Sequence, residues 1–390
     1  MPDGEASLVV EVCPSLDQVD RDAWDACAGP ENPFVSHDFL SSLEESRSVR
    51  AETGWLPQHL LLRDGTGALI GAMPLYLKGH SQGEYIFDHS WAHAYENAGG
   101  DYYPKLLSAV PFTPVPGPRL LTAAASDPAA AAHYLIGAMA QLTERHGVSS
   151  LHVNFLEPEQ AGMLESAGFL MRHGHQFHWH NRGYRSFDDF LDRLASRKRK
   201  AIRKERRKIA EAGLRCRALR GDAITPDLWD AFYAFYVDTY QRKWGGPYLT
   251  RQFFDLMHER MRDRVVLMLA FDPNDRPIAG ALNLVGSEAI FGRNWGCLED
   301  YKFLHFELCY HMAIDYAIEH GLQRVEAGTQ GEHKIQRGYL PVPTYSAHLI
   351  PDPNFRDAIA RFLERERDHE ADLRGYLNEA GPYRKDIQDA

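Results

Sequence analysis

The chain has 390 residues, of which 44% are hydrophobic and 25% charged, a composition typical of a soluble globular protein with room for two domains. It lacks the run of about 18 apolar residues that a membrane span needs, and it opens without a basic head and apolar stretch. We therefore expect a cytoplasmic protein. The five cysteines form no Cys-x-x-Cys pair, so neither a disulfide framework nor a thiolate zinc site is predicted. The net charge is −11, yet the basic residues are clustered.

The first part of the chain predicts a helix and a hairpin. Residues 23–26 read AWDA and open a helical segment. The run HLLLRDGTGALIGAMPLYL then predicts two strands around a turn at Asp64 to Gly67, with the second strand beginning near Ile70.

Polar and aromatic residues gather after this hairpin, in HSQGEYIFDHSWAHAY and in an aromatic, proline-rich loop over residues 92–127. Aromatic faces beside a few charges suit a sugar, nucleobase or peptide. The candidates for binding an acceptor are Tyr85, Asp88, Lys105 and Arg119. The alternative is an ordered loop rich in hydrogen bonds.

A helix ending at Gly147, the strand LHVNF and a short helix closed by Gly168-Phe169 come next. The following stretch, HGHQFHWH, contains four histidines. On a strand His173 and His175 face one side while His178 and His180 face the other, so we predict no metal site.

The segment SRKRKAIRKERRK, residues 196–208, carries nine Lys or Arg among thirteen positions and predicts a basic helix. Cations at this density wrap most of the helix and suit a phosphate backbone. The candidates for phosphate or nucleic-acid binding are Arg197, Lys198, Arg199, Lys200, Arg203 and Arg206. The alternative is a solvated helix paired with the acidic remainder of the protein.

The second half repeats the first. LWDA at 228–231, a hairpin with its turn at Asp272 to Arg276, a helix ending at Gly321, the strand RVEAG and the pair Gly338-Tyr339 follow in the same order, before a C-terminal helix over about 354–378. We predict an α/β protein of two tandem units. The expected divisions are 1–185 for the first unit, 186–213 for the basic helical connector and 214–390 for the second unit.

The segment EAGTQGEHKIQRG follows a predicted strand of the second unit, where ligands of open α/β sheets bind. Acyl transfer to an amine needs a proton acceptor and donors for the oxyanion. The candidates for catalysis are Glu326, Glu332, His333 and Lys334, and those for substrate binding are Gln330, Arg337, His305, Glu307 and Tyr310. A solvated, salt-bridged loop is the alternative. The matching strand of the first unit, LHVNFLEPEQ, has no such cluster, which favours one active site.

Several long segments carry a family resemblance: TGWLPQHL, PFTPVPGPR, SRKRKAIRKER, FLHFELCY and EAGTQGEHKIQRGY. The order of elements resembles the GCN5-related N-acetyltransferase (GNAT) fold, and the chain resembles the Fem-type peptidoglycan aminoacyltransferases, in particular the "peptidoglycan biosynthesis/recognition" or predicted N-acyltransferase family. The resemblance implies transfer of an acyl or aminoacyl group, often from aminoacyl-tRNA, to an amine acceptor such as a peptidoglycan precursor. It implies no tightly bound cofactor.

The sequence departs from the related folds in two places. NWGCLEDYKFLHFE lacks the glycine loop that would hold the coenzyme A pyrophosphate, which makes acyl-CoA a less favoured donor. Gln336-Arg337-Gly338-Tyr339 stands where many Fem enzymes have Lys-Lys-Gly-Phe. We therefore hypothesise an N-acyltransferase whose basic helix and Arg337 hold the donor. The alternatives are an enzyme using acyl-CoA or an acyl carrier protein, and a non-catalytic module that binds RNA or cell-wall precursors.

Overall fold

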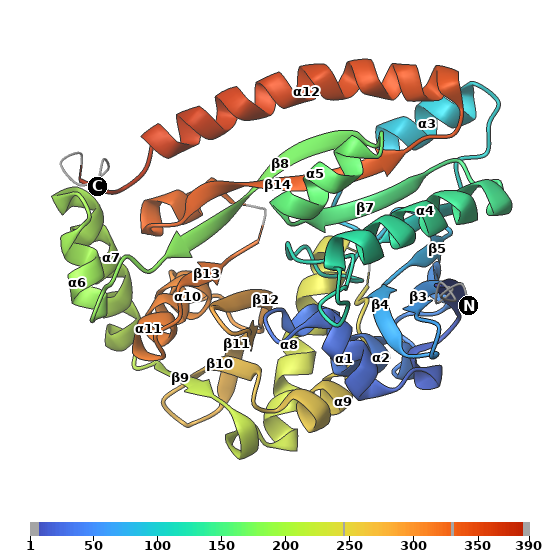
Figure 1. Ribbon diagram of the computed structural model, residues 1–390. Coiled ribbons are helices and arrows are strands. Elements are labelled where there is room, and N and C mark those ends of the chain that lie inside the picture. Colours follow the sequence, from blue (N-terminus) through green and yellow to red (C-terminus); the bar gives the residue numbers. More distant parts are fainter. Residues whose placement is uncertain (1–7, 245, 329–330, 385–390) are drawn as a thin grey trace. The chain divides into compact units, whose positions relative to one another are not determined.

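The computed structural model describes residues 8–244, 246–328 and 331–384, with the side chains of residues 243 and 244 left aside. The chain forms two compact units (Figure 1). Unit 1 comprises Met1–Gly174 and Thr344–Glu370, and unit 2 comprises His175–Pro343 and the segment from Ala371. Among the described residues, no helix has the length and apolar character needed to cross a bilayer.

Unit 1 holds the N-terminal elements. Its strands are β1 (Val9–Cys13), β2 (Trp55–Pro57), β3 (His59–Arg63), β4 (Leu69–Met73), β5 (Tyr76–Lys78), β6 (Lys105–Ser108) and β7 (Leu151–Leu156). Its helices are η1 (Leu16–Gln18), α1 (Arg21–Ala28), η2 (Pro33–Val35), α2 (His37–Glu45), η3 (Ala51–Thr53), α3 (His89–Asn97), α4 (Pro128–His146) and α5 (Pro158–Ser166). β1, β3 and β4 form a small sheet, and β2, β5, β6 and β7 lie in the main sheet.

The predicted hairpin of unit 1 is present, but it bends between these two sheets. β2 and β3 are separated by Gln58, and β4 and β5 by Pro74 and Leu75. Because Pro74 has no backbone N–H, it cannot donate to a continuous ladder. Each arm of the hairpin therefore contributes one strand to each sheet: β3 and β4 lie in the small sheet, and β2 and β5 lie in the main sheet.

Unit 2 repeats this order of strands without the bend. Its strands are β9 (Arg215–Leu219), β10 (Val265–Phe271), β11 (Pro277–Val285), β12 (Ala289–Cys297) and β13 (Arg324–Glu326). Its helices are α6 (Phe187–Asp192), α7 (Ser196–Glu211), η4 (Gly221–Ala223), α8 (Pro226–Trp244), α9 (Arg251–Met261), α10 (Leu304–Phe306), the π-helix η5 (Glu307–His311), α11 (Met312–Glu319) and η6 (Glu332–Arg337). β9 to β12 pair antiparallel in chain order, and β12 pairs parallel with β13, as β6 does with β7.

Three elements run from one unit into the other: β8 (Leu170–His180), β14 (Leu340–Leu349) and α12 (Pro353–Glu379). The end of β8 pairs with β13 in unit 2, while the end of β14 pairs with β7 in unit 1. Each half of the chain thus gives its last strand to the other unit, an exchange that the division of the chain into 1–185, 186–213 and 214–390 did not anticipate.

The repeat itself and the C-terminal helix are as predicted, and α12 is the long red helix of Figure 1. The expected loop over residues 92–127 is wrong in part, because it contains the end of α3 and the whole of β6. The run of glycine and proline around these elements concealed a strand of only four residues, Lys105–Ser108, which is buried throughout.

The same turn chemistry closes both hairpins. Asp64 Oδ1 accepts hydrogen bonds from the amides of Thr66 and Ala68, and Asp272 Oδ1 accepts from those of Asn274 and Arg276. An aspartate that binds amides two and four residues ahead fixes a tight reversal. Each unit also has its own apolar core, around Leu135 and Val153 in unit 1 and around Trp179 and Val266 in unit 2.

Candidate active site

A small cavity of unit 2 lies where β12 and β13 separate. β13 pairs with β12 only as far as Phe291 and Glu326, while β12 continues to Cys297. β12 also carries one extra residue against β11, since Asn283 faces Gly292 but Ala281 faces Trp295. Bulges of this kind re-aim side chains beside active sites.

The cavity has a volume of about 100 Å³. It is lined by Ala281, Leu282, Asn283, Gly292, Arg293, Asn294, His305, Cys309, Tyr310 and Ala327. Its walls are therefore the bulged strands β11 and β12, the end of β13 and the segment that contains the π-helix η5. Two of the predicted residues, His305 and Tyr310, line it, whereas Asn283 and Asn294 were not predicted.

A tyrosine–histidine pair stands at this cavity. Tyr310 Oη lies 2.9 Å from His333 Nε2, and the His305 ring lies 5.2 Å from the Tyr310 ring and 5.9 Å from the His333 ring. Partial burial, then the charges of Arg337 and Lys334, lower the pKa of His333. The imidazole is therefore neutral at neutral pH and can accept a hydrogen bond from the Tyr310 hydroxyl, whose pKa burial raises.

Backbone geometry explains how η6 presents His333. Gly331 precedes η6 with φ 102°, and Gly338 follows it with φ 92°, values that side-chain-bearing residues rarely adopt. A Cβ at Gly338 would also lie 2.7 Å from the Phe190 ring. The segment 331–338 is thus a defined turn in which Glu332 and His333 are exposed while Lys334 and Arg337 are buried.

Lys334 secures the end of β13. Its Nζ donates to the carbonyl oxygens of Ala327, at 2.6 Å, and Gly328, at 3.1 Å. Burial lowers the pKa of Lys334 to about 8. Since Ala327 lines the cavity, Lys334 holds one of its walls. Gln330, the neighbouring candidate, lies outside the described residues.

Glu326 is buried at the end of β13 and belongs to a local network. Its Oε1 accepts from Arg324 Nε at 2.8 Å, and its Oε2 lies 3.7 Å from His178 Nε2. Burial lowers the pKa of His178 to about 3, so this imidazole is neutral. Glu332, in contrast, is exposed on η6.

Arg337 and Glu307 are both held by partners within unit 2. Arg337 pairs with Glu205 of α7 at 2.5 Å and donates to the carbonyl of His333 at 2.7 Å. Glu307 is buried and pairs with Arg206 at 3.0 Å. The prediction that these two side chains bind substrate receives no direct support, because both are committed to internal ion pairs.

The basic helix α7 has two different faces. Ile202 and Ile209 pack into the core, and the cations on that side have partners: Lys198 donates to Gln336, Arg199 pairs with Asp192, and Arg206 pairs with Glu307 and Asp315. At its edge Arg203 pairs with Asp188.

The outer face of α7 carries the exposed cations. Arg197, Lys200 and Lys204 are three and four residues apart and so share one side of the helix. In the part of the chain that the structure describes, these three have no partner. Arg203, Arg207 and Lys208 are exposed too, but they pair with Asp188 and Glu211. Only the strip that Ile202 and Ile209 occupy lacks cations, so the expectation that they wrap most of the circumference agrees with the helix. Arg197, Lys200 and Lys204 form an unpaired stripe, and its binding of a phosphate-bearing ligand stays a prediction.

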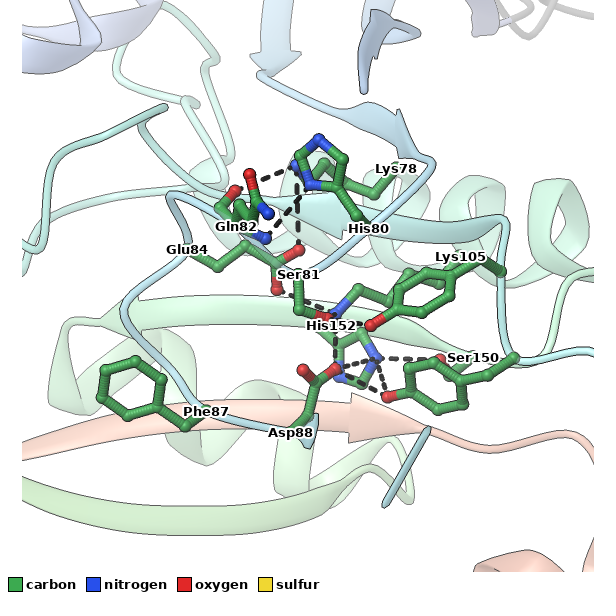
Figure 2. Close-up of polar contacts among 12 residues, drawn as sticks. Lys78, His80, Ser81, Gln82, Glu84, Phe87, Asp88, Lys105, Ser150 and His152 are labelled. Carbon is green, nitrogen blue, oxygen red and sulfur yellow. Dashed lines mark hydrogen bonds and ion pairs between the residues drawn. The ribbon is translucent and has the colours of Figure 1, made fainter. Parts of the chain in front are cut away.

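In unit 1, Asp88 and Lys105 belong to a buried cluster of charges. Figure 2 shows Lys105 with Ser81, Glu84 and Asp88: its Nζ donates to Ser81 Oγ and Glu84 Oε2 at 2.8 Å each, and also to Asp88. All three donors of this ammonium are thereby used. The side chains of Lys105, Glu84 and Asp88 are at most 2% exposed.

The electrostatics of this cluster follow from burial. Burial opposes the charge on Lys105 and on Asp88, but their mutual attraction outweighs it, raising the pKa of Lys105 and lowering that of Asp88. For Glu84 and Lys78, which lie 3.9 Å apart, burial outweighs the nearby opposite charges: it raises the pKa of Glu84 to about 7 and lowers that of Lys78 to about 7. His152 Nε2 lies 3.3 Å from Tyr102 Oη and 3.8 Å from Asp88 Oδ2, and burial lowers the pKa of His152 to about 3.

Two further candidates of unit 1 lie apart from this pattern. Arg119 is fully buried and donates to the carbonyls of Val115, Pro118 and Asn154, so its guanidinium is used to hold the chain. Tyr85 is half-buried in the loop after β5 and has a left-handed backbone, with φ 60°. The role of both in acceptor binding stays a prediction.

Solved structures share this fold. FemX matches with a TM-score of 0.54 and 11% identity, covering 88% of this chain and 99% of FemX. The C-terminal domain of a putative lysylphosphatidylglycerol synthetase from Agrobacterium fabrum matches with a TM-score of 0.56 and 10% identity, covering 90% and 97%. L-PGS from Bacillus licheniformis matches at 0.51 and 8%, covering 86% and 98%.

At such low identity these likenesses show the fold alone, and with the repeated order of strands they agree with the predicted two tandem GNAT-like α/β units. No curated protein matches the chain. The family model described as peptidoglycan biosynthesis/recognition, FemAB-like, matches residues 15–385. The chain belongs to the FemAB-like family, which confirms the resemblance seen in the sequence. Membership and fold together support a transferase.

Proposed function

We propose that the chain is an N-acyltransferase that moves an aminoacyl group from aminoacyl-tRNA to an amine of a peptidoglycan precursor. The observation that carries this proposal is the cavity of unit 2, where Tyr310 lines the wall and hydrogen-bonds His333. The family description supports the peptidoglycan acceptor.

The tyrosine–histidine pair supplies the proton acceptor that aminolysis requires. As the acceptor nitrogen attacks the ester carbonyl, its proton passes to the Tyr310 oxygen and the hydroxyl proton of Tyr310 passes to His333 Nε2. The new N–C bond replaces the ester C–O bond. The ribose oxygen of the tRNA leaves as a hydroxyl by taking a proton back from the Tyr310–His333 relay, which returns both side chains to their starting state. Because His333 is neutral at neutral pH, it can start this relay.

The oxyanion needs a donor inside the cavity, and we assign that role to Asn294. Its amide nitrogen lies 3.4 Å from Tyr240 Oη, a long hydrogen bond that is easily exchanged for a stronger one. Cys309 lines the same cavity, but burial raises the pKa of its thiol. It supplies no thiolate, which favours direct attack on the donor over a thioester intermediate.

The choice of aminoacyl-tRNA rests on two stretches of charge. The outer face of α7 presents Arg197, Lys200 and Lys204 to a phosphate backbone. The loop that leads into α10 contains Glu299 and Asp300 and no glycine, so it disfavours the pyrophosphate of acyl-CoA.

The test is a transfer assay with the purified full chain. Bulk tRNA charged with labelled amino acids is offered together with a nucleotide-linked muramyl pentapeptide that has a free amine, and label is expected on the peptide. Turnover with acyl-CoA in the absence of tRNA would overturn the donor. Binding of charged tRNA with no transfer to any amine would favour the non-catalytic module.

A further inference from the structure

Glu205 stands at the centre of a buried ion network on the inner face of α7. Its Oε1 accepts from Arg337 Nη2 at 2.5 Å, and its Oε2 accepts from Arg337 Nε at 3.1 Å and from His311 Nε2 at 3.0 Å. Burial opposes its charge, but these hydrogen bonds outweigh burial and lower the pKa of Glu205. The carboxylate is therefore ionised, and it bridges two segments that are distant in sequence.

The first of these segments is η6. Arg337, whose side chain is 8% exposed, uses its remaining Nη1 to donate to the carbonyl of His333 at 2.7 Å. Its guanidinium also stacks 3.4 Å from the centre of the Phe306 ring. A planar guanidinium that is held by a carboxylate, a carbonyl oxygen and an aromatic ring has little freedom to move. Glu205 thus fixes Arg337, and Arg337 fixes the backbone of His333.

The second segment is the π-helix η5. His311 is 1% exposed and adjoins Tyr310 in the chain. Its bond to Glu205 restrains the turn that carries the tyrosine. The backbone carbonyl of Tyr310 in turn accepts from Tyr339 at 3.1 Å, next to Gly338 at the end of η6. π-Helical turns are rare and are frequently found at functional sites.

We propose that Glu205 is the positioning residue that sets the separation of Tyr310 Oη and His333 Nε2. One carboxylate holds one member of the pair through Arg337 and the other through His311. This inference rests on the proposed function, since it assigns a cause to the geometry of the proton relay. The hydrogen bond from Lys198 to Gln336 is a second link from α7 to η6.

Glu205→Gln tests this role, because it keeps the size of the side chain and removes its charge. In the transfer assay with charged tRNA and the muramyl pentapeptide, kcat should fall roughly 10-fold, since small errors in position are costly in rate. The KM for aminoacyl-tRNA should stay within about twofold, because the outer face of α7 is untouched. Glu211→Gln is the matched control: this carboxylate lies on the same helix but pairs at the surface with Lys208, and its loss should leave both constants unchanged.

A double-mutant cycle separates positioning from a merely structural effect. His333→Ala alone should lower kcat about 100-fold, and adding Glu205→Gln should then lower it no further, because the pair to be aligned is already lost. Arg337→Lys, which keeps the charge but cannot reach both partners, should behave as Glu205→Gln does and replaces it if that variant fails to fold. An equal further loss of kcat in the His333→Ala background would overturn the role of Glu205. A wild-type kcat for His333→Ala would overturn the proposed relay itself.

Discussion

The two units use the same framework of strands, but they differ in charge at the corresponding strands β6 and β12. In unit 1, Lys105 opens β6 and is neutralised by Glu84 and Asp88, with every donor of its ammonium occupied. In unit 2, the corresponding strand β12 is bulged and lined by amides such as Asn294, beside a cavity. A repeated fold can therefore close this strand position with buried ion pairs in one copy and leave a cavity beside it in the other.

The exposed cations follow the same division. Lys78 and Lys105 of unit 1 are completely buried, whereas the outer face of α7 in unit 2 leaves Arg197, Lys200 and Lys204 in solvent. Buried charges that are paired mainly fix a conformation, while exposed charges remain available to a ligand. This comparison makes three predictions, given from the largest effect to the smallest.

Replacing Lys105 with methionine would break the closed cluster. Glu84 and Asp88 would then be buried without their cation, and we expect a loss of about 3 to 5 kcal/mol in the free energy of unfolding. Urea unfolding measures it. Lys204→Met removes an exposed cation and should change stability by less than about 0.5 kcal/mol. Retained stability with a raised KM for the acceptor would instead show that the cluster binds substrate, as the sequence suggested.

Lowering the pH tests a feature that the two units share, a buried neutral histidine. The pKa of His178 is about 3 in the folded chain and about 6.5 when unfolded. Below pH 6.5 His178 therefore binds a proton in the unfolded chain but not in the folded chain, so the free energy of unfolding decreases as the pH falls. Between pH 7 and 5 this loss is about 2 kcal/mol.

His178→Gln should remove that part of the pH dependence, as measured by chemical unfolding at the two pH values. The exposed His320 on the end of α11 offers the control, since His320→Gln should keep the wild-type difference. Identical pH dependence in wild type and His178→Gln would show that His178 titrates normally in the folded chain.

Neutralising the stripe on α7 should weaken tRNA binding. In the combined variant Arg197→Gln, Lys200→Gln and Lys204→Gln, we expect the Kd for tRNA to rise roughly 10-fold at low salt and the slope of log K against log salt to shrink by roughly 2 to 3. Filter binding over a salt series measures both. Changing Arg361, Arg365 and Arg367 of α12 to glutamine alters the net charge equally and should have little effect on tRNA binding. An equal loss of affinity in that variant would show that net charge, and not the stripe on α7, accounts for the binding.

Local patterns in the sequence were sufficient for much of the fold. The Asp-led turns at Asp64 and Asp272, and the glycines that end helices at Gly147 and Gly321, act through neighbours only a few residues away. The exchange of β8 and β14 could not be predicted, because a strand's pattern shows that it pairs but does not show which partner it takes.

The sequence identified several residues of the site but not how they interact with one another. Tyr310 and His333 were both candidates, but their pairing spans 23 residues and depends on how η5 and η6 fold back. Glu205 was missed because it stands inside a run of cations, and its partner Arg337 is 132 residues away. Arg337 and Arg119 look free in the sequence, and only non-local contacts show that the protein itself uses them.

The strand exchange has a consequence for the order of synthesis. Unit 1 is complete only when Thr344–Glu370 has joined it, so a ribosome must translate nearly the whole chain before the first half can finish folding. Until then β7 lacks the strand that covers its edge in the finished protein. A chain cut between the repeats would lack β14 and leave that edge of β7 open, so the first half cannot complete its sheet alone.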